Sequence, residues 1–91
     1  MPTVWVPAPW RDKLTEGRQQ VEVEGATVRQ VIEALEARYP GFRQRIVDEE
    51  SGRIRPGIAV SVDGEVSAEG MRRQVGASSE VHFLPAISGG R

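Results

Sequence analysis

The side chains that usually carry catalysis are scarce in this chain, which has one histidine and no cysteine among its 91 residues. The absence of cysteine excludes thiol catalysis, zinc–thiolate and iron–sulfur sites, and disulfides. His82 lies within an alternating segment, where a solvent-facing strand residue is a simpler interpretation than the base of a nucleophilic triad. The acidic run 48–50 lacks the glycine-turned spacing of a cation loop. We therefore expect no enzyme, no bound metal and no cofactor.

The segment with distinctive chemistry is the C-terminal run Ser88-Gly89-Gly90. Two consecutive glycines lack Cβ atoms, so the chain there is narrow and can adopt φ of either sign, which suits threading into another protein's active site. A carboxylate on Gly90 would stand on an unhindered arm, able to attack a phosphate of ATP. The alternative is an ordinary frayed, glycine-rich terminus.

The near-equal numbers of positive and negative residues give no indication of a highly charged binding partner. Lys and Arg number 12 against 13 Asp and Glu, and the net charge of −1 argues against nucleic-acid binding. Two basic pairs, Arg53 with Arg55 and Arg72 with Arg73, fall on expected turns, where they either contact a partner's acidic rim or only confer solubility. The sequence has neither an apolar run of about 18 residues nor a secretory leader, so we expect a cytoplasmic protein without membrane contact.

Periodicity predicts one main helix and several short strands. Thr27 caps a helix that runs to Tyr39, because its hydroxyl and the Gln30 side chain, three residues later, can satisfy two free backbone donors. Residues 7–17 are expected to be a connection, and short turns are expected at 42–47 and 71–75. Alternating polar and apolar residues predict strands at 3–6, 20–23, 58–62, 65–66 and 80–84. Asp63-Gly64 predicts a tight hairpin.

These elements predict an α+β domain at 1–85, with a flexible tail at 86–91. A composition of 38% hydrophobic and 27% charged residues is that of a single small globule. The helix must cover one face of a mixed sheet of four or five strands. If the first and last strands are parallel neighbours, the fold is a β-grasp, but spacing alone leaves that pairing open. Alternation directs one set of side chains toward the helix: Val4, Val6, Val60, Val62, Val81 and Phe83.

The run 81–90, in which a strand leads through Pro85 into Gly89-Gly90, resembles the C-terminus of the MoaD/ThiS-like ubiquitin-like sulfur carriers. The resemblance covers nearly the whole chain. It extends to the helix start at Thr27, the helix end at 35–40, the strand and turn at 58–64, and the segment 78–81. Within the family, the carrier of the carrier-dependent cysteine synthase pathway is the most similar, in residues 4–7, Tyr39, the 48–57 loop and residues 83–86.

The resemblance implies a β-grasp fold and a chemical role for Gly90. Its carboxylate would be adenylated by a ubiquitin-activating-like adenylyltransferase that uses ATP and Mg²⁺, and then converted to a thiocarboxylate. The sulfur would pass to an enzyme such as a cysteine synthase or the large subunit of molybdopterin synthase. Ile87, Ser88 and Gly89 would thread into these partners. Active carriers end at the second glycine, so Arg91 departs from the pattern, and either a peptidase removes it or it is not native.

Strand alternation also predicts a surface for docking these enzymes. Trp5, His82 and Leu84 face away from the helix, and Pro85 follows them. An exposed tryptophan and leucine with a polar rim are typical of docking sites. The alternative is that the loop carrying Trp10 covers Trp5. We expect substitution of Trp5 or Leu84 by serine to weaken enzyme binding with little change in stability.

Two other functions use the same features. The Gly90 carboxylate could be joined to lysines of target proteins, which would make the chain a ubiquitin-like modifier. The chain could also be a structural subunit with an inert tail. The sequence does not distinguish cysteine, molybdopterin, thiamin and transfer-RNA thiolation pathways.

Overall fold

The computed structural model describes residues 1–66 and 68–85 of the chain. Its helices and strands follow one another along the chain as β1 (Thr3–Trp5), α1 (Ala8–Leu14), β2 (Gln20–Glu22), α2 (Val28–Arg38), α3 (Phe42–Ile46), β3 (Ile58–Val62), β4 (Glu65–Val66), the 3₁₀-helix η1 (Gly70–Arg72) and β5 (Glu80–Pro85). The expected main helix, both short turns and all five strands are present, with bounds that differ by at most three residues.

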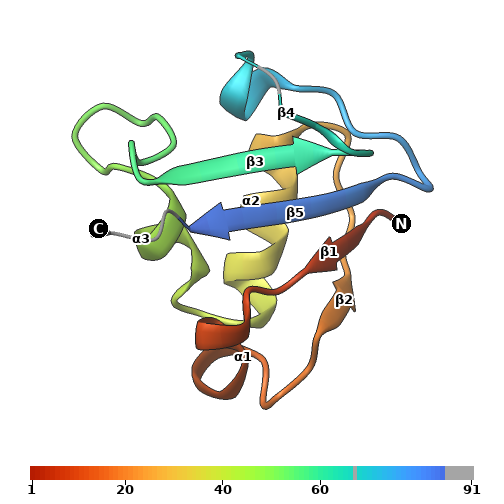
Figure 1. Cartoon of the computed structure of the whole chain (residues 1–91), viewed down its shortest axis with the longest axis vertical. Helices are drawn as coiled ribbons and strands as arrows, with labels where there is room; N and C mark the ends of the chain where they lie inside the picture. The colour runs from red at the N-terminus through yellow and green to blue at the C-terminus, as the bar shows by residue number, and fades with distance from the viewer. Residues whose placement is uncertain (67, 86–91) are drawn as a thin grey trace.

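The five strands form one mixed sheet in the order β2-β1-β5-β3-β4 (Figure 1). The first and last strands, β1 and β5, are parallel neighbours in its middle, and every other pairing is antiparallel. This is the β-grasp arrangement, so the pairing that the spacing left open is confirmed. The consequence for function is that β5, which leads to the C-terminal segment, is the central strand.

Helix α2 covers one face of the sheet, as Figure 1 shows. Its buried face consists of Val28, Val31, Ile32 and Leu35, all with no exposed surface. The sheet residues that the alternation directed toward the helix are buried as well: Val4, Val6, Val60, Val62, Val81 and Phe83. Full burial of each such aliphatic side chain contributes about 1.5–3 kcal/mol. The opposite face of the sheet is therefore the one available to a partner.

The N-terminus of α2 is capped as the sequence predicted, with one difference. The Thr27 hydroxyl accepts a hydrogen bond from the Gln30 backbone N–H at 3.2 Å. The Gln30 side chain accepts from the backbone N–H of Ala26 at 2.7 Å, one residue before the cap. Two donors that the helix leaves free are thus satisfied.

The expectation of a helix-free connection at 7–17 is wrong, because the seven residues of α1 occupy most of it. Pro9 is compatible with a helix there, since it lies in the first turn, where a backbone N–H has no partner within the helix. Trp10 and Leu14, four residues apart, pack against the core. The Thr15 hydroxyl ends the helix by donating to the Arg11 carbonyl at 3.1 Å.

Candidate functional site

The candidate residues that the structure describes all come from the two parallel central strands. They are Trp5 of β1 and His82, Leu84 and Pro85 of β5, and we refer to them together as the docking surface. The candidates of the C-terminal segment lie outside the described residues: Ile87, Ser88, Gly89, Gly90 and Arg91.

A row of side chains crosses the face of the sheet that points away from α2. Trp5 lies opposite Gln20 of β2 on one side and His82 on the other. His82 in turn lies opposite Ser61 of β3. The indole of Trp5 and the imidazole of His82 stack with ring centroids 5.4 Å apart and planes 4° from parallel. The centre of this face is therefore occupied by this stacked aromatic pair, which we call the aromatic platform.

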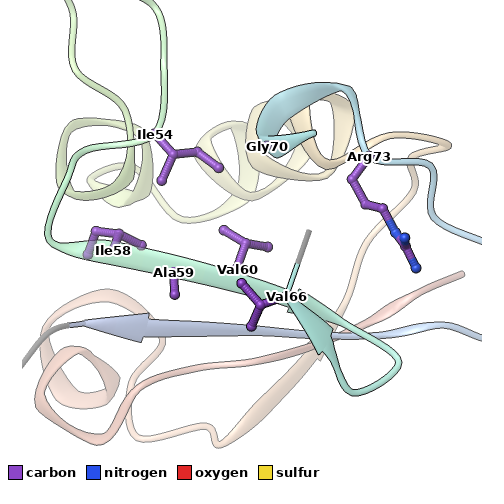
Figure 2. Close-up of a pocket in the computed structure, with 7 residues that line it drawn as sticks. All are labelled: Ile54, Ile58, Ala59, Val60, Val66, Gly70 and Arg73. Carbon is purple, nitrogen blue, oxygen red and sulfur yellow. The ribbon is translucent and has the colours of Figure 1, made fainter. Parts of the chain in front are cut away.

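Leu84 continues the same face one step closer to the end of β5. It lies opposite Ala59 of β3, and Figure 2 shows Ala59 and Val60 pointing to opposite sides of that strand. Leu84 is 46% exposed, one of the few large apolar side chains at the surface of the described chain. Pro85, half-buried opposite Ile58, is the last described residue. The platform thus borders the point where β5 leads into the segment 86–91.

The structure corrects the expected environment of Trp5. Its side chain is only partly exposed, and its Nε1 atom is buried without an acceptor among the described residues. The ring that contacts it belongs to His82, whereas Trp10 packs edge-on against Phe42, at a centroid distance of 6.4 Å. Because partly buried aromatic side chains contribute packing energy, replacing Trp5 should affect stability more than the sequence suggested.

A hydrogen-bond cluster at the other end of β5 holds the strand in register. The Asp63 carboxylate accepts from the Glu80 backbone N–H at 2.9 Å and from the Ser79 hydroxyl at 2.8 Å. These two bonds, in that order of importance, keep the pKa of Asp63 below its ordinary value of 3.8. Asp63 and Gly64 both have positive φ, 53° and 86°, as a tight hairpin between β3 and β4 requires. The cluster positions His82 and Leu84 indirectly, by fixing the start of their strand.

Residues 1–66 and 68–85 contain no group of three or more metal-ligating side chains. None of their helices is long and apolar enough to cross a lipid bilayer.

The sequence predicted which face of the sheet Trp5, His82 and Leu84 share, but not how their side chains are arranged on it. The stacking of Trp5 on His82 depends on the register of two strands from opposite ends of the chain, which alternation does not determine. Gln20 and Ser61 border the platform for the same reason. The two-residue periodicity of a strand predicts on which face of the sheet each side chain lies. Which side chains become its neighbours depends on how the strands pair.

Comparison with known proteins identifies the chain's relatives. The model of the ThiS family matches residues 4–90. The sulfur carrier protein CysO of Mycobacterium tuberculosis is 32% identical over 79 residues, which are 84% of this chain and 85% of the relative.

Solved structures agree with that comparison. A chain in the crystal structure of the Amycolatopsis orientalis BexX/CysO complex superposes with a TM-score of 0.88 and 34% identity, covering 99% of this chain and 100% of the other. The small archaeal modifier protein 1 of Methanosarcina acetivorans superposes with a TM-score of 0.78 and 26% identity, covering 98% and 95%.

Proposed function

The chain belongs to the ThiS family, and from this premise we propose that it carries sulfur on the carboxylate of Gly90 and donates it to a biosynthetic enzyme. The observation that carries the proposal is the extent of the family match, which reaches residue 90 and so includes Gly89-Gly90. The name of the M. tuberculosis relative, a sulfur carrier protein, supports the same role. In this proposal the chain is a carrier and its partners are the catalysts.

The chemistry requires two steps at the Gly90 carboxyl group. A carboxylate oxygen attacks the α-phosphorus of ATP, held with Mg²⁺ by an adenylyltransferase, and pyrophosphate leaves. A sulfide-level sulfur supplied by the partner then attacks the acyl-adenylate, AMP leaves, and a thiocarboxylate remains. The absence of side chains at Gly89 and Gly90 leaves the carboxylate oxygens open for the first step and the carbonyl carbon open for the second.

The docking surface would hold the carrier while its tail is in a partner's active site. An aromatic platform flanked by an exposed leucine supplies apolar contact area at low conformational cost, because the stacked rings are already ordered. Its position beside Pro85 means that a protein seated on the sheet also meets the start of the C-terminal segment. The adenylyltransferase and the sulfur-accepting enzyme would use this surface in turn.

Arg91 must be removed before the first step. With Arg91 in place, the α-carboxylate belongs to an arginine, whose long charged side chain does not fit a slot shaped for glycine. Hydrolysis of the Gly90–Arg91 peptide bond by a peptidase produces the reactive end. Where Arg91 is not native, this step is unnecessary and the chemistry is otherwise the same.

The recipient of the sulfur is proposed to be a cysteine synthase. The resemblance to CysO proteins over more than four-fifths of the chain favours this pathway over molybdopterin synthesis. The structure of a BexX/CysO complex supports the expectation that a chain of this shape binds a partner enzyme.

A second function, conjugation to lysines of target proteins, is favoured by one observation. The small archaeal modifier protein 1 of M. acetivorans has the same fold at 26% identity. Both functions begin with an adenylated Gly90, and they differ in whether the acceptor is sulfur or a lysine amine.

ATP–pyrophosphate exchange with the host's adenylyltransferase tests the proposal. The chain ending at Gly90 should support exchange, and the chain ending at Arg91 should not until it is trimmed. Matched controls are a chain ending at Ser88 and a Gly90→Ala variant of the trimmed form. Absence of exchange with the Gly90-ended chain would refute the proposal, and Gly-Gly remnants on target lysines without any thiocarboxylate would replace it with the modifier function.

A further inference from the structure

A basic hollow of about 560 Å³ opens where three segments meet on the helix-bearing side of the sheet. Arg29 comes from the first turn of α2, Arg53 from the loop after α3, and Arg72 from η1. Glu69 is the only acidic residue in the lining. The sequence presented Arg53 and Arg72 as members of separate pairs, and the fold brings them together with Arg29.

The three guanidinium groups have no carboxylate partners within the described chain. Its ion pairs join Arg43 to Glu49 at 3.7 Å and Arg73 to Glu65 at 3.3 Å. Arg29, Arg53 and Arg72 are exposed, and their guanidinium groups make no hydrogen bond with residues 1–66 and 68–85. The backbone N–H of Arg53 donates to the Ser51 hydroxyl at 3.1 Å. The three positive charges that line the hollow outnumber its single carboxylate, Glu69, so the lining has a net positive charge.

The position of Arg29 in α2 is also electrostatically unfavourable for the helix. The first turn of α2 contains no acidic residue, and a cation there faces the positive end of the helix dipole. Arg29 therefore does not stabilise α2, and its charge is available to contact a negatively charged partner.

An apolar pocket of about 200 Å³ adjoins the hollow (Figure 2). Both share Ile54 and Gly70 as lining residues, and Ile58 and Val60 extend the pocket along β3. Arg73 closes its far end, and the Arg73 Nε atom is buried without an acceptor among the described residues. A ligand for the combined surface therefore needs carboxylates and one aliphatic side chain.

We propose that this surface binds an extended acidic segment of a partner protein, with one aliphatic side chain in the apolar pocket and carboxylates on Arg29, Arg53 and Arg72. The spacing of the arginines over three segments, all of them exposed, suits a chain with several charges better than a single small anion. The surface lies on the side of α2 and η1, whereas Trp5, His82 and Leu84 lie on the other face. A protein on the docking surface therefore leaves the basic hollow accessible, and the chain can hold two partners at once.

The test is a titration of the whole chain, in the absence of any activating enzyme, with a fluorescent hexapeptide of five glutamates and one isoleucine. We expect saturable binding that weakens with salt and shifts the NMR amide signals of residues 51–54 and 69–73. Arg53→Glu with Arg72→Glu should weaken binding about tenfold, because two attractions become repulsions. The matched control, Lys13→Glu with Arg18→Glu, reverses the same number of exposed charges elsewhere and should leave affinity unchanged.

Replacing the isoleucine of the peptide by serine should also weaken binding. The proposal is overturned if both double variants lose affinity equally, since that result means unspecific attraction. It is overturned as well if inorganic phosphate shifts the same signals and the peptide does not, since that result means a small-anion site. Because the experiment uses neither ATP nor the C-terminal carboxylate, its failure leaves the carrier proposal standing.

Discussion

Trp5 and His82 lie side by side on the parallel strands β1 and β5, with their rings stacked at 5.4 Å. These two strands are the first and last of the chain, so the platform exists only when both ends of the domain are in place. It also lies on the strand that leads into Gly89-Gly90. In the proposed function, both the docking of a partner and the presentation of the tail therefore depend on this one strand pair.

Substitution of Leu84 by serine should weaken binding to the adenylyltransferase about tenfold while changing stability by no more than about 0.5 kcal/mol. Leu84 is 46% exposed and so contributes little to the core. Calorimetric titration and urea unfolding measure the two quantities. Ala37→Ser, at an exposed position on α2 on the other side of the sheet, is the control and should change neither quantity by more than about 0.5 kcal/mol. A large loss of stability in Leu84→Ser would show that the outer face is not free.

Substitution of Trp5 by alanine should destabilise the domain by about 1–2 kcal/mol, because it removes a partly buried ring and its stacking on His82. A double-mutant cycle with His82→Ala should give a coupling energy of about 0.5–1.5 kcal/mol. Equilibrium unfolding of the four proteins measures it. Strict additivity of the two substitutions would contradict the stacked geometry.

The sequence predicted that a helix covers one face of a sheet, but it left open which strands are neighbours in that sheet. The stripe of Val28, Ile32 and Leu35 and the strand alternation required α2 over a sheet, because each apolar face needs a partner. Helix α1 was missed, since Pro7 and Pro9 resemble breakers and a seven-residue helix shows little periodicity.

The candidate site was likewise predictable only in part. The faces of Trp5, His82 and Leu84 followed from local alternation. The stacking of two rings, and the gathering of Arg29 with Arg53 and Arg72, depend on contacts between distant segments, which no local pattern encodes.

Substitution of Thr27 by alanine should destabilise the domain by about 1 kcal/mol. The hydroxyl of Thr27 is the acceptor for the Gln30 backbone N–H, which would lose its partner. Thr27→Ser keeps the hydroxyl and is the matched control, with a change of less than about 0.5 kcal/mol. Thermal unfolding measures both, and equal losses in the two variants would show that the cap does not stabilise α2.

Substitution of Asp63 by asparagine should destabilise the domain at neutral pH but not in strong acid. The lowered pKa of Asp63 means that its carboxylate is favoured in the folded state, so its contribution is present above the unfolded pKa and is lost as the pH falls through the folded one. Asparagine tolerates the positive φ of this position, which keeps the hairpin intact. Urea midpoints of the two proteins should differ at about pH 7 and converge near pH 2. A difference that persists in acid would mean that the charge is not responsible.

The most direct test of the account is the mass of the C-terminal peptide of this protein, isolated from its native source under demand for sulfur. We predict a fraction that ends at Gly90 and carries one sulfur in place of one oxygen. A protein found only with an intact Arg91, or with an unmodified Gly90 carboxylate, under those conditions would contradict the carrier function.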